Sequence, residues 1–188
     1  MKRFAIAVSF ALSLIASTAS AQQTLYRETD DHWFIYVEAE SCVAYVDYHN
    51  GDIDVTFRVS HRPDVDRIFF TAYGNQFERY REGIGESILL GLGFDSSREF
   101  LGSVGMIMRN LGGEMGVHGS EYDIEEFFRL MMTKREVLIR VMQNGAPGQS
   151  AHVVSGTTDF GPFPLTGAQI AMMHLQECTS RHFPNSGR

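Results

Sequence analysis

The sequence is poor in cysteine, with two among its 188 residues, Cys42 and Cys178. No Cys-x-x-Cys spacing occurs, which excludes a thioredoxin-like redox motif and a cysteine-based zinc site. Two lone thiols usually pair in an oxidising compartment. We therefore expect a Cys42–Cys178 disulfide that ties the start of the globular part to its end; two free buried thiols are the alternative.

Basic residues are also scarce, with 16 lysines and arginines against 23 aspartates and glutamates. Lys2 and Arg3 belong to a leader that we expect to be removed, which leaves 14 basic against 23 acidic residues and a net charge of −9. Nucleic-acid binding needs clustered lysine and arginine. We therefore expect no nucleic-acid partner, and no attraction to an anionic membrane surface.

Long apolar runs are limited to one, from Phe4 to Ile15, which is about a dozen residues long. Lys2 and Arg3 precede it, and the small residues Ala19-Ser20-Ala21 follow it, which is the pattern of a signal peptide. A membrane-spanning helix needs roughly 20 apolar residues. We expect residues 1–21 to be a cleaved signal peptide, leaving a periplasmic or secreted protein without a transmembrane segment.

Alternation of apolar and polar side chains predicts strands in most of the chain. The clearest case runs from Ile53 to Val59, with the period of a strand that has one face in water. Asn50-Gly51 is a strong hairpin signal and joins this strand to one that begins at Cys42. Further strands are expected at Trp33–Val37, Arg67–Tyr73, Ser87–Phe94, Phe100–Met108, Val137–Val141 and Ala151–Ser155. Glycines in the strands between 87 and 108 predict bulges or tight bends there.

Two segments have the period of a helix. Apolar residues at 124, 127, 128 and 131 form one helical face, and a second helix is expected from Ala168 to Cys178. Ser120 and Thr166 are each followed three residues later by a polar partner, so we expect them to cap these helices. The glycine-rich segment 112–119 is expected to be a flexible loop that leads into the first helix.

These elements predict an α+β fold, mainly an antiparallel β-sheet of sandwich-like form, with one or two packed helices including a C-terminal helix. No repeat or long linker divides the chain. We expect one globular domain at residues 22–181 and a flexible tail at residues 182–188.

The order of short motifs resembles one family of exported bacterial proteins. The residues concerned are Trp33, Cys42-Val-Ala44, Phe127-Phe-Arg-Leu130, Val137-Leu-Ile-Arg-Val141, Phe163-Pro-Leu165, Gly167, Ala171, Leu175 and Cys178. This arrangement resembles the invasion-associated locus B type of small periplasmic protein, over residues 33–178. The resemblance implies a β-rich extracytoplasmic domain that is not known as an enzyme, and it brings no catalytic residue. The glycine-rich middle and the lack of further cysteines depart from the family pattern.

Residues that could carry chemistry do not combine into a known motif. The seven histidines have no metal-site spacing, and the Asp-x-Asp pairs at 52/54 and 64/66 do not continue as calcium loops. The glycine-rich segment lacks the lysine of a phosphate loop, and Gly-x-Ser-x-Gly does not occur. We therefore expect no metal and no cofactor.

The helix at 124–132 has more apolar residues than one buried face needs. Leu130 and Met132 fall toward its flanks, and we expect at least one of them to be exposed. Such a patch would suit a protein partner or an apolar ligand; plain core packing is the alternative. The first hypothesis for function is a non-catalytic envelope domain that binds or supports another macromolecule. The alternative is a hydrolase with a dispersed active site.

Overall fold

The computed structural model describes residues 24–29, 32–50, 53–64, 67–95, 100–110, 112–142 and 157–184. The expected signal peptide at 1–21, the strand expected at 151–155 and the last four residues of the expected tail lie outside these ranges. The elements are β1 (Thr24–Glu28), β2 (Phe34–Val37), β3 (Cys42–Asn50), β4 (Ile53–Arg62), β5 (Arg67–Gly74), η1 (Asn75–Gly83), β6 (Ser87–Phe94), β7 (Phe100–Arg109), β8 (Met115–Tyr122), α1 (Ile124–Thr133), β9 (Glu136–Met142), β10 (Thr157–Pro164) and α2 (Ala168–His182).

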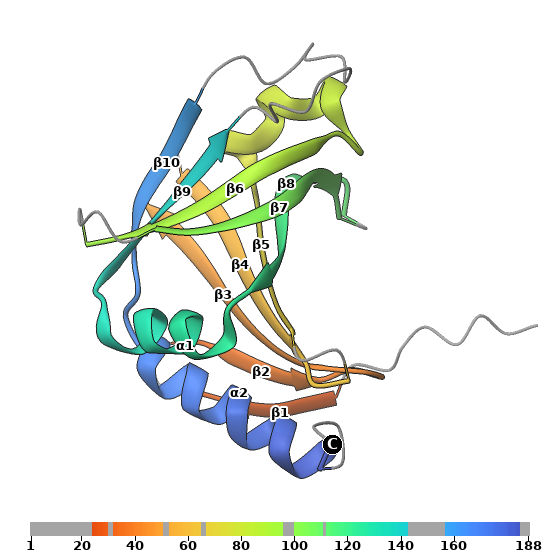
Figure 1. Ribbon diagram of the computed structural model, residues 1–188, viewed down its shortest axis with the longest axis vertical. Helices are drawn as coiled ribbons and strands as arrows, with labels where there is room; N and C mark the ends of the chain where they lie inside the picture. Colours follow the sequence, from red (N-terminus) through yellow and green to blue (C-terminus); the bar gives the residue numbers. More distant parts are fainter. Residues whose placement is uncertain are drawn as a thin grey trace, which may run out of the picture.

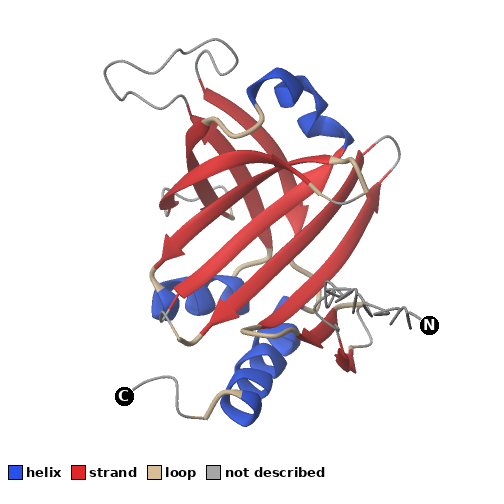
Figure 2. Ribbon diagram, turned by 90° about the vertical axis from the view of Figure 1, so that its right-hand side faces the viewer, coloured by secondary structure: helices blue, strands red, loops and turns tan. Residues whose placement is uncertain are grey.

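The strands form one antiparallel sheet in the order β1-β2-β3-β4-β5-β8-β7-β6-β9-β10. The sheet curls until its two halves face each other, with α1 and α2 at one end and η1 at the other (Figures 1 and 2). Phe57 of β4 and Phe163 of β10 meet across the core, with ring centroids 5.1 Å apart. The predicted class, a mainly antiparallel α+β fold with a C-terminal helix, is confirmed.

Strand β4 shows how the sequence separates the two faces of the sheet. Val55, Phe57 and Val59 are buried in the core, as the period of two predicts. Arg58, between them in sequence, projects from the opposite, outer face and is half-buried. The outer face of β4 therefore carries polar side chains that other parts of the chain can partly cover.

The glycines of β6 allow an aromatic ring to lie on the sheet. A Cβ atom at Gly93 would come within 2.8 Å of the Phe100 ring, and one at Gly91 within 3.2 Å of it. Arg140 covers this ring, with its guanidinium carbon 4.5 Å from the ring centroid. The β6–β7 pairing is regular from Ser87 to Gly93, so the prediction of bulges here was wrong. The glycines instead allow the Phe100 ring to approach the backbone of β6 closely.

The N-cap of helix α1 lies three residues after its expected position. Asp123, and not Ser120, is the N-cap: its carboxylate accepts a hydrogen bond from the Glu126 amide at 2.8 Å. Ser120 lies within β8, which also includes Met115–Gly119, the segment expected to be a flexible loop. Residues 115–119 pair with β5 and β7, and the ladder hydrogen bonds override the flexibility that their glycines suggest.

Helix α2 runs along β2 and β3 and is fastened by the disulfide. Cys42 and Cys178 are bonded, and both are fully buried, which confirms the expected pairing. The N-cap is Gly167 in a left-handed conformation (φ 73°), so the capping role expected of Thr166 was wrong. The Thr166 carbonyl instead accepts a hydrogen bond of 2.9 Å from the Trp33 indole.

Four elements were not anticipated: β1, η1, β8 and β10. Strand β10 contains Pro162 and Pro164, residues that disfavour a central strand but are tolerated at the edge of a sheet, where β10 lies. Among the described residues, no helix has the length and apolar character needed to cross a membrane.

Candidate functional site

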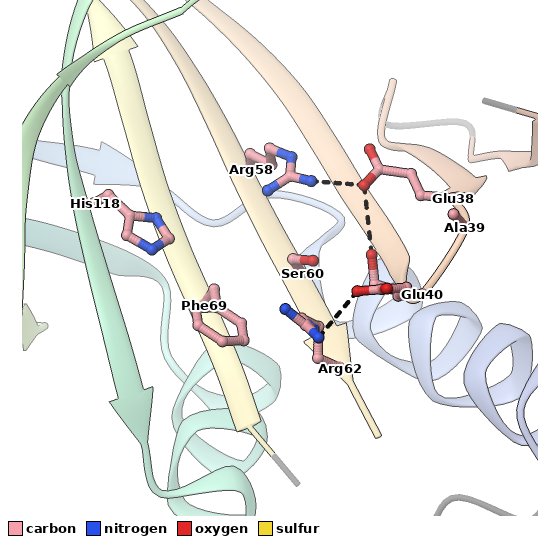
Figure 3. Close-up of a pocket in the computed structure, with 9 residues that line it drawn as sticks. Glu38, Ala39, Glu40, Arg58, Ser60, Arg62, Phe69 and His118 are labelled. Carbon is pink, nitrogen blue, oxygen red and sulfur yellow. Dashed lines mark hydrogen bonds and ion pairs between the residues drawn. The ribbon is translucent and has the colours of Figure 1, made fainter. Parts of the chain in front are cut away.

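A groove on the outer face of the sheet is the best candidate site. It lies where the turn between β2 and β3 passes beside β4, β5 and β8, and its volume is about 370 Å³ (Figure 3). We call it the outer groove. It is lined by Glu38, Ala39, Glu40, Ser41, Arg58, Ser60, Arg62, Phe69 and His118. A volume of this size is at the lower end of the range for ligand sites.

Strand register brings the floor of the outer groove together. Ser60 lies opposite Phe69 in the β4–β5 pairing, and Arg58 lies opposite Thr71. Thr71 in turn lies opposite His118 of β8. These residues share the outer face because side chains of the same parity in paired strands project the same way.

Arg58 is held in place by two neighbours. Its Nη2 donates to Glu38 Oε2 at 2.8 Å, and its Nε donates to the Tyr45 hydroxyl at 3.0 Å. Burial would lower the pKa of Arg58, but the neighbouring Tyr45 and Glu38 outweigh it and keep this pKa above its ordinary value. Arg58 therefore remains a fixed cation, and its charge is balanced by Glu38.

A second ion pair lies at the mouth of the outer groove. Arg62 Nη2 is 3.0 Å from Glu40 Oε2 and 2.9 Å from Asp64 Oδ2. Both partners are largely exposed, so this pair is screened by water and weaker than the half-buried Arg58–Glu38 pair. The two arginines and two glutamates that line the outer groove leave it without net charge.

Phe69 and His118 stack on each other in the outer groove. Their rings are nearly parallel, with an angle of 13° between planes and 5.7 Å between centroids. The His118 Nδ1 is 2.9 Å from the Thr71 hydroxyl, which fixes the orientation of the imidazole. Burial, and then the positive charge of Arg58, lower the pKa of His118 below its ordinary value. The neutral form of the ring is therefore favoured at pH 7.

The lowered pKa of His118 should be visible in an NMR titration of its ring protons. We expect a midpoint below about 6.5, the value of free histidine. Between the folded pKa and about 6.5, the imidazole of the unfolded chain binds a proton that the folded chain does not bind. The contribution of His118 to the free energy of unfolding is therefore lost as pH falls through this range. Arg58→Gln should raise the midpoint but leave it below about 6.5, since burial is the larger cause. A midpoint at or above that of free histidine would contradict this.

Ser60 is the buried polar residue at the floor of the outer groove. It is 3% exposed, and its hydroxyl has no hydrogen-bond partner among the described residues. Figure 3 shows it between Arg58 and Arg62. The Ser60 hydroxyl is therefore available to a ligand in the outer groove.

The outer groove contains one pair with the composition of a hydrolytic site, Thr71 and His118. Thr71 is only 1% exposed, so a substrate could not reach its hydroxyl. No carboxylate of the described residues is hydrogen-bonded to the His118 ring, which a nucleophile–base–acid arrangement would need. The geometry therefore favours binding over acyl transfer at this position.

The apolar patch expected on α1 is not formed as predicted. Leu130 is 1% exposed and belongs to the core, so it is not an exposed member of the expected pair. Met132 is half-buried and packs against the core at its edge. The helix lies between the sheet and α2, and two of its sides are covered instead of one. Met132 lines a second cavity of about 350 Å³, together with Lys134, Arg135 and Gly167.

Exposed apolar side chains gather elsewhere in the described part of the chain. On β6 and β7 they include Leu89, Val104 and Met106, and on α2 they are Ile170 and Met173. Leu89 and Val104 are opposite each other on the outer face. No cluster of three or more histidine, cysteine, aspartate or glutamate residues able to hold a metal ion occurs among the described residues.

No family model, curated protein or solved structure matches this chain. The outer groove is therefore defined by its geometry alone. Sequence reasoning missed its residues, although the alternation in β4 placed Arg58 on the wet face of a strand. The missing information was that Glu38, 20 residues earlier, folds back over that face.

Proposed function

We propose that this protein is a non-catalytic binding domain of the cell envelope, and that the outer groove holds part of another macromolecule. The observation that carries the proposal is the groove floor, where Ser60, without a hydrogen-bond partner among the described residues, lines the cavity between two arginines that are each ion-paired to a glutamate. A rigid set of donors and acceptors of this kind is preorganised for a ligand.

Two features support a place outside the cytoplasm. The first 21 residues have the pattern of a signal peptide. The Cys42–Cys178 disulfide is a bond that persists in oxidising compartments and is rare in the cytosol.

We also propose kinship with the invasion-associated locus B type of periplasmic protein. Residues that carry this resemblance gather where α2 packs on β2 and β3. Trp33 is hydrogen-bonded to Thr166, Cys42 is bonded to Cys178, and Leu175 is fully buried in the same region. This grouping supports the resemblance as a shared structural core.

Site-specific photo-crosslinking in the producing cell tests the binding function. A benzophenone amino acid in place of Phe69 should give a discrete adduct, because this half-buried ring lines the outer groove. The same substitution at Ile84, which is 47% exposed and outside the groove, is the control and should give none. Adducts would be identified by gel shift and mass spectrometry. No adduct at position 69, or equal adducts at both positions, would reject the proposal.

A further inference from the structure

The side chains of the outer groove offer hydrogen-bond donors and acceptors next to each other. Arg58 and Glu38 are 2.8 Å apart, and Arg62 and Glu40 are 3.0 Å apart. A ligand hydroxyl is both donor and acceptor. Neighbouring hydroxyls on one ligand can therefore bond to an arginine and to the glutamate beside it.

Charge argues against a strongly ionic ligand. The charges of the two arginines and two glutamates cancel. Burial and the charge of Arg58 lower the pKa of His118, which favours the neutral imidazole. The whole protein is acidic, with a formal net charge of −7. An anion would gain little from this field, and a cation would meet Arg58 and Arg62 at the floor.

Two unused groups point to a ligand with many polar atoms. Ser60 lines the outer groove, and its hydroxyl has no hydrogen-bond partner among the described residues. The Nε2 atom of His118 likewise has no hydrogen-bond partner in the part of the chain described, since the ring bonds to Thr71 through Nδ1. Both face the same groove as the two ion pairs.

The sheet face does not favour an extended peptide. The floor strands β4, β5 and β8 are each paired on both sides, so their backbone groups are already used in ladders. A peptide could not add as a strand there. The Phe69 ring, which lines the groove and stacks on His118, instead suits the apolar face of a sugar ring.

We propose that the ligand of the outer groove is a neutral saccharide chain, whose hydroxyls bond to Ser60 and the two Arg–Glu pairs while one ring lies against Phe69. This rests on the proposed binding function and assigns its ligand class. The groove volume of about 370 Å³ confines the recognised part to a short stretch of such a chain.

Titration of the full chain, exported with its own N-terminus, with three neutral trisaccharides tests the assignment. The probes are maltotriose, cellotriose and triacetylchitotriose, and the readout is the ¹H–¹⁵N spectrum. At least one should shift the amide signals of Ser60, Phe69 and His118 saturably. Ser60→Ala should weaken binding about two- to tenfold through the loss of one hydrogen bond. Phe69→Ala should weaken it about tenfold.

Ser87→Ala is the matched control, because Ser87 lies on the outer face of β6 but does not line the groove. It should leave binding unchanged. No response to any trisaccharide, or equal effects of Ser60→Ala and Ser87→Ala, overturns the saccharide assignment. An uncharged, end-blocked octapeptide is titrated in parallel. If it binds in the groove and the sugars do not, the ligand class is wrong and the binding function stands. If neither binds and position 69 gives no crosslink, both proposals fail.

Discussion

Replacing Cys42 and Cys178 together by alanine should lower the free energy of unfolding by about 5 kcal/mol. The bond closes a loop with a sequence separation of 136, and in the chain-entropy model a loop this long restricts the unfolded state by about that amount. Many domains are stable by only about 5–15 kcal/mol. The double variant should therefore be barely folded at 37 °C.

Urea unfolding followed by tryptophan fluorescence measures this difference. The chain has one tryptophan, Trp33, which is 1% exposed and lies beside α2, where the disulfide is anchored. The native protein treated with a reductant during unfolding is the control and should approach the double variant. A loss of less than about 1 kcal/mol would show that the bond does not hold the N-terminal strands to α2.

Phe127→Ala should destabilise the protein by about 3–5 kcal/mol. The ring is fully buried, with the Tyr122 ring centroid at 5.7 Å and the Phe70 ring centroid at 6.5 Å. Removing it leaves a cavity between α1 and the sheet that its neighbours cannot fill without moving.

The matched control is Met173→Ala on α2, where the side chain is 56% exposed. Substitutions at such positions usually change stability by less than about 0.5 kcal/mol. Thermal and urea unfolding of both variants give the two values. Similar losses in the two variants would mean that α1 is not packed on the core through Phe127.

The sequence alone predicts the elements in which local pattern and tertiary burial agree. The alternation from Val55 to Val59 corresponds to a buried face of the structure, and so does most of the helical face at 124–131, whereas Ile53 is 40% exposed. Helix starts were harder, because Ser120 and Asp123 are both good caps and only the length of β8 decides between them. Strand β10 was not predicted because Pro162 and Pro164 disfavour a strand except at the edge of a sheet. That β10 lies at an edge follows only from the strand order of the whole sheet.

The candidate site could not be predicted for a similar reason. Its floor comes from β4, β5 and β8, and its wall comes from the turn at 38–41. The sequence predicts an ordinary surface position for Arg58, whereas in the structure it is half-buried and paired with Glu38. It likewise predicts a solvated Ser60, whereas this residue is 3% exposed once the strands pair. Leu130 shows the opposite error, since α2 covers a side of α1 that a lone amphipathic helix would expose.

The central claim is that the outer groove is the surface by which this protein binds. The most direct measurement is photo-crosslinking at position 69 in cells that also carry Ser60→Leu, a change that fills the groove floor beside Phe69. We predict that the adduct seen with Ser60 disappears with leucine, while the amount of protein and its disulfide stay the same. An adduct of equal strength with leucine at position 60 would contradict the claim.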